Sequence, residues 1–269
     1  MRHRVNGREI EDYQRFDVMD TGLAIPRAES LYVPAISNGI GPSDFIVDDD
    51  LVMYAPLYRL RASKFKTVDR YRATGTVTGA LWRPNGRLSD SVDDRTLIAD
   101  HAAIQNIFDG GGTLMSWINP ASDGEDNFGQ IMRRISGWLH FVTGEAGGAV
   151  KVRFSIVRAT QNGQWITDDP DVPLNAWTMV TATYNSDHVD NNAIIYINKT
   201  ARTVGSGLTE DSIPIGARVS DVGDDLSIGG SSDGSLTFDG LVGESWQYTR
   251  IFTLAEVTHN LNATKWRYQ

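Results

Sequence analysis

The chain changes character near residue 50, where the spacing of apolar residues becomes regular. Residues 1–47 show no sustained two-residue or 3.6-residue apolar period, and turn pairs such as Asn6-Gly7 separate short apolar patches. From Leu51 onward, runs rich in Val, Ile, Thr and aromatic residues recur between Gly, Asn and Asp clusters, which is typical of strands and turns. We therefore predict an extended N-terminal arm over residues 1–47 and a β domain over residues 48–269.

Short strands without long helices between them predict the architecture of that domain. Residues 151–157 show the strand period clearly, because Val152, Phe154 and Ile156 alternate with polar residues, as in a half-buried antiparallel strand. We expect two packed antiparallel sheets, that is, an all-β sandwich. The predicted strands are residues 51–57, 75–81, 96–98, 112–118, 129–135, 138–143, 150–157, 177–185, 193–198, 225–228 and 240–252.

Two short helices are expected beside the sheets. Residues 99–108 carry apolar side chains at roughly helical spacing and end at a run of three glycines. A second helix begins at Thr253, because Thr253 and Glu256 have the spacing of a capping box. Leu254, Val257 and Leu261 then share one face of that helix.

Composition and charge exclude several classes of function. The formal net charge is −9, and a general polyanion binder needs a basic surface, so we expect no nucleic-acid partner for the molecule as a whole. Cysteine is absent, which excludes disulfides, thiolate metal sites and cysteine nucleophiles. The start of the chain is basic and polar and no apolar run approaches the ~20 residues of a membrane span, so we expect no secretory signal and no span.

The N-terminal arm carries residues that a bare linker does not need. Arg4 and Arg8 suit an acidic partner, and Phe16, Tyr32 and Phe45 suit pockets on a neighbouring subunit. We interpret these five residues as partner-binding, with a solvated tail as the alternative.

Segments from residue 50 to 260 resemble, in order, the laminin-G-like domains of the concanavalin A-like lectin and glucanase family. The resemblance implies a concanavalin-like jelly roll, of the kind found in bacteriophage structural proteins. Gly243 is a departure, because the family usually has Asp there, and any turn or cation role at that place is weakened. The segments are LVMYAPL at 51–57, GTVTGALW at 75–82, TLMSWINP at 113–120, LNAWTMVTATY at 174–184, IYIN at 195–198, and FDGLVGE with YTR within 238–250.

The aromatic residues of these segments are interpreted as core or as sugar platforms. Trp117, Trp177 and Tyr196 are expected to fill the layer between the sheets. Sugar sites need an exposed ring with polar neighbours, and Trp165 and Trp82 are the candidate glycan-binding residues. Core packing is the alternative for these two as well.

The acidic residues and histidines of this chain do not have the spacing that the family's hydrolytic enzymes use. Relatives that hydrolyse glycosides use paired carboxylates on one strand, typically as E-x-D-x-E. The nearest match is Asp123-Gly124-Glu125 in a glycine-rich loop, and the five histidines are scattered. We expect no enzymatic activity and no catalytic residue.

Calcium is the candidate cofactor. Carboxylate oxygens in turns suit this ion, and the resemblance implies an ion at a sheet rim in many members. Asp93, Asp94 and Asp239 are the candidate ligands. Acidic turns without any ion are the alternative.

The resemblance and the arm together lead to a functional prediction. We predict a non-enzymatic virion structural protein, a capsid decoration or cement protein that anchors through its arm and displays the sandwich. The expected location is the virion surface, with the cytoplasm as the alternative, and the expected partner is a capsid or other particle protein. We expect a homo-oligomer, with a trimer favoured. The alternative function is a carbohydrate-binding, lectin-like module.

Overall fold

The computed structural model describes residues 4–5, 8–9, 17–18, 24–25 and 44–269. The chain divides into two compact units, Met1–Ser43 and Asp44–Gln269. The first unit contains two short antiparallel pairs, β1 (Arg4–Val5) with β2 (Arg8–Glu9) and β3 (Asp17–Val18) with β4 (Ala24–Ile25). The second unit is the β domain and carries everything that follows.

The first sheet of the β domain, sheet I, is built around two long central strands, β11 and β22. The strand β11 pairs antiparallel with β22 on one side and with β17 on the other, and β22 pairs along its other edge with β5 and β9. The strands of sheet I are β5 (Leu51–Pro56), β8 (Leu81–Arg83), β9 (Gly86–Asp90), β11 (Gly112–Pro120), β17 (Thr178–Tyr184), β18 (Ile194–Ile197), β19 (Thr200–Val204) and β22 (Asp239–Tyr248).

The second sheet, sheet II, faces sheet I across the core. Its strands run antiparallel from the edge strand β6 to β20, and β20 makes a short parallel pairing with β19 that joins the two sheets. The strands are β6 (Lys64–Lys66), β7 (Thr74–Thr78), β10 (Arg95–Ile98), β21 (Leu226–Ile228), β12 (Gly129–Arg134), β13 (Trp138–Ala146), β14 (Ala149–Ile156), β15 (Gly163–Thr167), β16 (Val172–Pro173) and β20 (Gly207–Ser212).

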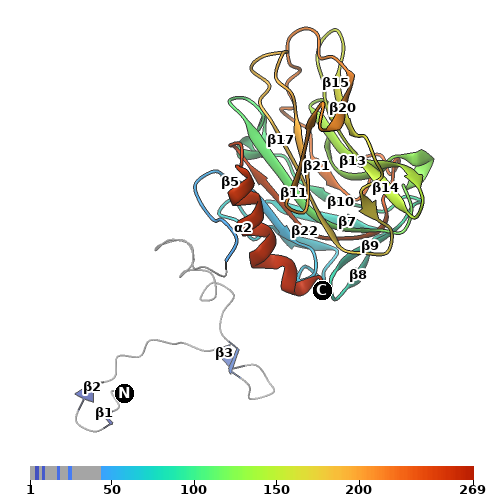
Figure 1. Cartoon of the computed structure of the whole chain (residues 1–269). Coiled ribbons are helices and arrows are strands. Elements are labelled where there is room, and N and C mark those ends of the chain that lie inside the picture. The colour runs from blue at the N-terminus through green and yellow to red at the C-terminus, as the bar shows by residue number, and fades with distance from the viewer. Residues whose placement is uncertain (1–3, 6–7, 10–16, 19–23, 26–43) are drawn as a thin grey trace. The chain divides into compact units, whose positions relative to one another are not determined.

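One α-helix packs against the outer face of sheet I. The helix α2 (Leu254–Thr264) continues into the 3₁₀ turn η4 (Lys265–Arg267), and it lies beside β22 and β5 (Figure 1). The Thr253 hydroxyl accepts a hydrogen bond from the backbone N–H of Glu256, whose carboxylate accepts one in return from the backbone N–H of Thr253. This confirms the predicted capping box. Two other 3₁₀ turns of the β domain are η2 (Ala102–Ile104) and η3 (Glu125–Asn127).

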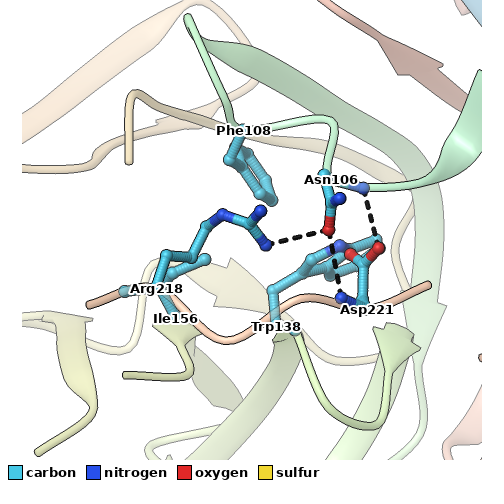
Figure 2. Close-up of a pocket in the computed structure, with 7 residues that line it drawn as sticks. Asn106, Phe108, Trp138, Ile156, Arg218 and Asp221 are labelled. Atoms are coloured by element: carbon cyan, nitrogen blue, oxygen red, sulfur yellow. Dashed lines mark hydrogen bonds between the residues drawn. The ribbon is translucent and has the colours of Figure 1, made fainter. Parts of the chain in front are cut away.

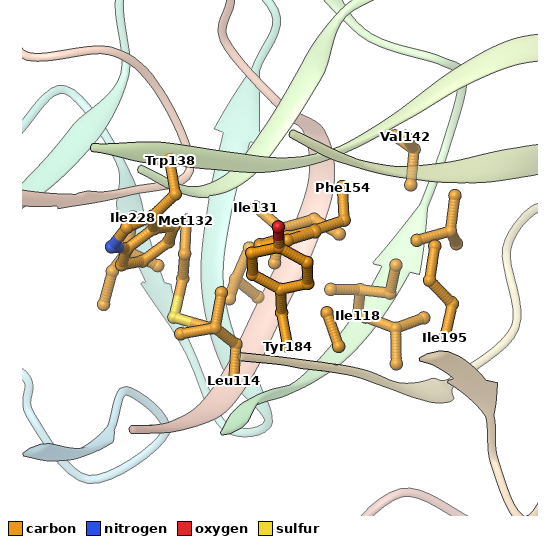
Figure 3. Packing of buried hydrophobic residues seen from close by; sticks show 14 of the residues in the cluster. Leu114, Ile118, Ile131, Met132, Trp138, Val142, Phe154, Tyr184, Ile195 and Ile228 are labelled. Atoms are coloured by element: carbon orange, nitrogen blue, oxygen red, sulfur yellow. The ribbon is translucent and has the colours of Figure 1, made fainter. Parts of the chain in front are cut away.

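Two hydrophobic cores result, because sheet I is buried on both faces. Leu114 and Ile118 of β11 point between the sheets, where they meet residues of sheet II such as Met132 and Phe154 (Figure 3). The alternate residues of the same strand, Met115 and Trp117, belong to a second cluster beneath α2. We call these the inter-sheet core and the outer core.

The all-β sandwich with a short C-terminal helix agrees with the predicted fold. The prediction missed β6, β8, β9, β15, β16, β19 and β20, which are short or polar strands without a clear apolar period. The predicted placement of Trp117, Trp177 and Tyr196 between the sheets was wrong, because Trp117 and Tyr196 pack in the outer core and Trp177 packs against it. A two-residue period identifies a buried face but does not say which of two layers covers it.

The helix predicted for residues 99–108 was also wrong. The segment forms only the single 3₁₀ turn η2, and Asn106 has a φ of 52° in the left-handed region. The Asn106 side-chain oxygen accepts hydrogen bonds from Arg218, Ser220 and the backbone N–H of Asp221. These tertiary bonds compete with a helix, as asparagine side chains commonly do.

Candidate functional site

A pocket of about 320 Å³ opens at the end of the outer core. This volume lies within the range of about 300–1,000 Å³ that is typical of small-molecule sites. The C-terminal part of α2, the turn η4 and the β18–β19 hairpin enclose it. Its lining residues are Trp117, Trp177, Asn198, Lys199, Leu261, Asn262, Lys265, Tyr268 and Gln269.

Three aromatic rings form the apolar wall of the pocket. The ring of Tyr268 stacks on Trp117 with centroids 4.5 Å apart and lies 4.6 Å from the ring of Trp177. The indole N–H of Trp117 donates to the hydroxyl of Thr264 at 2.8 Å, which fixes that ring beneath the helix. Trp117 and Tyr268 are almost fully buried, whereas Trp177 is half-buried, so Trp177 presents the accessible ring.

Amide and ammonium groups form the rim of the pocket. Lys199, Asn262 and Lys265 are exposed, and none of the lining residues has an acidic side chain. Asn198 has a φ of 55° at the tip of the hairpin, and its side-chain oxygen accepts from the backbone N–H of Met179 at 3.0 Å. This bond leaves the side-chain NH₂ group of Asn198 at the rim. The rim is therefore cationic and rich in hydrogen-bond donors.

A buried carboxylate holds the C-terminal segment that completes the pocket. Glu244 of β22 accepts hydrogen bonds from the hydroxyls of Tyr54 and Tyr268 at 2.9 and 3.4 Å, and it pairs with Arg267. Burial raises the pKa of Glu244 to about 7, and the nearby Arg267 guanidinium opposes that rise. The same carboxylate thus ties Tyr268 to the sheet.

Gly243, which precedes Glu244, is the departure from the family pattern noted above, and its surroundings give a reason for the glycine. A β-carbon on Gly243 would lie 2.6–2.9 Å from atoms of the Tyr268 ring. Such contacts are closer than side chains tolerate, so an Asp at this position would displace Tyr268. In this chain, the Tyr268 side chain occupies the space that a β-carbon at position 243 would need.

The residues predicted to bind glycan lie elsewhere in the structure. Trp165 is 0 % exposed in the inter-sheet core, and its N–H donates to Asn192, so the prediction of an exposed platform was wrong. Its strand β15 is covered by the opposite sheet, which a sequence pattern does not reveal. Trp82 is half-buried; its N–H donates to the carbonyl of Tyr58, and the guanidinium of Arg61 lies 4.4 Å from its ring.

The predicted partner-binding residues are distributed over both units. Phe45 belongs to the β domain, where its ring lies 4.6 Å from Tyr54 and 5.6 Å from Trp246. Phe45 packs against its own outer core and remains half-buried, so its insertion into a neighbour stays a prediction. Phe16 and Tyr32 lie outside the described residues, and Arg4 and Arg8 are described only as parts of β1 and β2.

Two of the three predicted calcium ligands come together with a third acid. Carboxylate oxygens of Asp90, Asp93 and Asp94 lie within 4.8 Å of one another. Burial and the adjacent acids Asp90 and Asp93 raise the pKa of Asp94 to about 6. Asp239 is paired in register with Asp90, but its carboxylate accepts from Ser122 and is not part of the cluster. Three hard oxygen donors in one turn fit calcium.

Two further polar groups serve the fold. Asp123 accepts from the backbone N–H of Glu145 and Glu125 accepts from that of Thr237, so each carboxylate holds a loop. Figure 2 shows a dimple where Asn106 bonds Arg218 and Asp221, beside Phe108 and Trp138. That dimple is too small to admit a water molecule.

Within the described residues, no helix combines the length and the apolarity that a membrane span requires.

Comparison with known proteins defines the class. A laminin-G-type family model, described as the concanavalin A-like lectin/glucanases superfamily, matches residues 91–258. The match covers more than half of the chain, and the chain belongs to this superfamily. None of the curated proteins matches it.

Solved structures share the fold at low sequence identity. Trypanosoma rangeli sialidase in complex with the inhibitor DANA is 15% identical with a TM-score of 0.56, over 80% of this chain and 33% of that one. The ligand-binding domain of botulinum neurotoxin serotype D in complex with N-acetylneuraminic acid is 13% identical with a TM-score of 0.55, over 80% and 51%. The receptor-binding domain of botulinum neurotoxin type G is 14% identical with a TM-score of 0.55, over 79% and 51%. The chain therefore spans between a third and a half of the length of these proteins.

Proposed function

We propose that this protein binds carbohydrate in the pocket beneath the C-terminal end of α2. The observation that carries the proposal is the aromatic wall of Trp117, Trp177 and Tyr268 beneath a rim of amide and ammonium groups. A sugar ring places its C–H face against an aromatic ring and its hydroxyls toward polar groups at the rim. The pocket offers both in one place.

The rim favours a sugar that carries a carboxylate. Lys199 and Lys265 both line the pocket, and no acidic side chain lines it. Within the described residues, neither lysine forms an ion pair, so both ammonium groups remain available to a ligand. The neurotoxin and sialidase structures of the same fold hold N-acetylneuraminic acid and the inhibitor DANA, and this supports an acidic sugar as the first ligand to test.

The test is a glycan array followed by titration calorimetry with the best ligand. Trp177→Ala removes the accessible ring and is expected to weaken binding by roughly tenfold or more, and Trp177→Phe should retain part of the affinity. Lys199→Gln should weaken acidic sugars more than neutral ones, whereas Lys151→Gln, outside the pocket, should bind like the wild type. Absence of binding to every glycan by the wild type would reject the proposal.

We propose, as a second role, that the domain is displayed on a particle through residues 1–43. The chain's division into the units Met1–Ser43 and Asp44–Gln269 supports a separate anchoring segment. The virion, its capsid partner, the surface location and the trimeric state remain predictions from the sequence. Because Phe45 and Ile46 pack in the outer core, the deletion that tests this role ends at residue 43. The shortened protein should remain folded and lose particle binding; unchanged binding would contradict the role.

Both proposed roles are binding functions, and calcium would support them structurally. Asp90, Asp93 and Asp94 would hold the ion in the turn between β9 and β10. Because β9 belongs to sheet I and β10 to sheet II, an ion there would fasten the rims of the two sheets together.

A further inference from the structure

The basic residues of this acidic protein are concentrated in one segment. Residues 57–87 contain eight Lys or Arg and a single Asp, whereas the whole chain contains 25 basic and 34 acidic residues. That single acid, Asp69, is buried, and its carboxylate accepts from the backbone N–H groups of Tyr54, Tyr71 and Arg72. The segment is therefore a positively charged region on a molecule whose net charge is negative.

Six of these cations are exposed along one edge of the domain. They lie in the loop before β6, on β6 itself and in the turn after it, and β6 pairs with a strand on one side only. Within the described residues, Asp49 is the only carboxylate that pairs with them, through Arg70 at 2.8 Å. We call this set the basic strip: Arg59, Arg61, Lys64, Lys66, Arg70 and Arg72.

Structural roles account for only some of the Lys and Arg residues in this segment. Arg87, in the same segment, is buried and donates to the carbonyls of Leu60 and Ala62, so it holds the loop together. Lysines on an edge strand such as β6 also discourage pairing with another chain. Neither role explains the exposed arginines outside the strand, Arg59 and Arg72.

Aromatic rings accompany the cations and lead back to the pocket. Arg61 lies 4.4 Å from the ring of Trp82, whose N–H donates to the carbonyl of Tyr58. The guanidinium of Arg267 lies 5.1 Å from the ring of Tyr58 and 4.6 Å from the ring of Trp266, which is 67 % exposed. Arg267 pairs with Glu244 and precedes Tyr268 of the pocket wall, so a chain of contacts joins the segment that completes the pocket to the basic strip.

We propose that the basic strip binds an anionic polysaccharide whose chain continues into the pocket. Cations along an edge match acidic groups repeated along a linear chain, and the rings beside them offer faces for its sugar units. The acidic remainder of the surface would repel the polymer and confine it to this edge. The inference rests on the proposed pocket and names the class of ligand that it takes.

The test compares binding of polygalacturonate with binding of its methyl ester, which keeps the sugar rings and removes the charge. Polygalacturonate should bind more tightly, and its affinity should fall as salt screens the exposed cations. The strip variant Arg59→Gln/Lys64→Gln/Lys66→Gln should bind it roughly tenfold more weakly and lose most of the salt dependence. The control Arg133→Gln/Lys151→Gln/Arg202→Gln removes the same charge elsewhere and should bind like the wild type. Thermal melts of each variant check that the fold is intact.

The variants separate this inference from the proposed pocket. If Trp177→Ala abolishes binding while the strip variant binds like the wild type, the pocket stands and the inference is overturned. If the strip variant loses binding while Trp177→Ala keeps it, the strip stands and the pocket assignment fails. Tighter binding of duplex DNA than of polygalacturonate or heparin, or salt-dependent self-association in place of binding, would also overturn the inference.

Discussion

The inter-sheet core and the outer core differ in how they are closed. Two complete sheets cover the inter-sheet core, and its largest side chains, such as Trp138 and Phe154, are fully buried. The outer core is covered by one helix and a short C-terminal segment, and it ends in the pocket of Trp117, Trp177 and Tyr268. A single helix is too narrow to cover a whole sheet face, so the uncovered end is where a ligand can reach buried aromatic rings.

The two cores also differ in the titratable groups that they bury. In the outer core, the hydroxyl of Tyr248 donates to the carbonyl of Ile46 and that of Tyr54 donates to Glu244. In the inter-sheet core, His140 is fully buried and both ring nitrogens lack a partner among the described residues. The outer core therefore holds its buried carboxylate in hydrogen bonds, whereas the inter-sheet core holds an imidazole without a partner, in a layer of closely packed side chains.

The largest effect is expected from a cavity in the inter-sheet core. Phe154→Ala should lower the free energy of unfolding by about 3–5 kcal/mol, because it removes a fully buried ring from between two rigid sheets. Urea titration followed by tryptophan fluorescence measures this change. A loss below about 1 kcal/mol would contradict the view that this core depends on packing.

His140 should make the inter-sheet core sensitive to acid. Burial lowers the pKa of His140 to about 3, so the unfolded chain binds more protons than the folded chain between pH 6.5 and 3. The stability that neutral His140 contributes is present above pH 6.5 and is lost as the pH falls, by about 3 kcal/mol between pH 7 and pH 4. His140→Leu should flatten this part of the pH profile of unfolding. An unchanged profile would show that His140 is not buried as described.

Glu244 should produce the opposite dependence in the outer core. Its pKa is raised to about 7, so the folded chain binds more protons than the unfolded chain between pH 4.5 and 7. Glu244 contributes fully to the free energy of unfolding below pH 4.5. This contribution declines by about 2–3 kcal/mol as the pH rises to 7, and solvent screening of the charges at Arg267 makes the measured decline smaller. Glu244→Gln should remove this slope. A slope of the same sign and size in the variant would contradict the assignment.

The smallest expected effect is that of calcium on the stability of the domain, through the turn between β9 and β10 that joins the two sheets. If Asp90, Asp93 and Asp94 bind calcium, saturating ion should stabilise the domain by about 1–3 kcal/mol at pH 7.5. Because the pKa of Asp94 is raised to about 6, protonation should weaken this effect below that pH. Thermal melts with calcium and with chelator measure it, and Asp93→Asn should abolish the difference. Equal melting temperatures in all conditions would reject the site.

Local patterns predicted the elements more accurately than they predicted the surroundings of each residue. Alternation on 151–157 and the capping box at Thr253 were both found in the structure, because they depend on neighbours close in sequence. Trp165 was misjudged because its exposure depends on a sheet formed by distant residues. The pocket was missed because Trp177, Lys199 and Tyr268 come from three separate segments. Lys199, directly after Asn198 at the tip of the hairpin, was the available signal.

By itself, the sequence determined that this chain forms an antiparallel sandwich with a capped C-terminal helix. Strand period, turn residues and capping act over a few residues, so they can be read in one dimension. Only the tertiary structure decided that sheet I has two cores, that Tyr268 occupies the space above Gly243, and that a basic strip lies along one edge. These features arise where segments distant in sequence meet, and their free energies depend on burial and contact that no local pattern records.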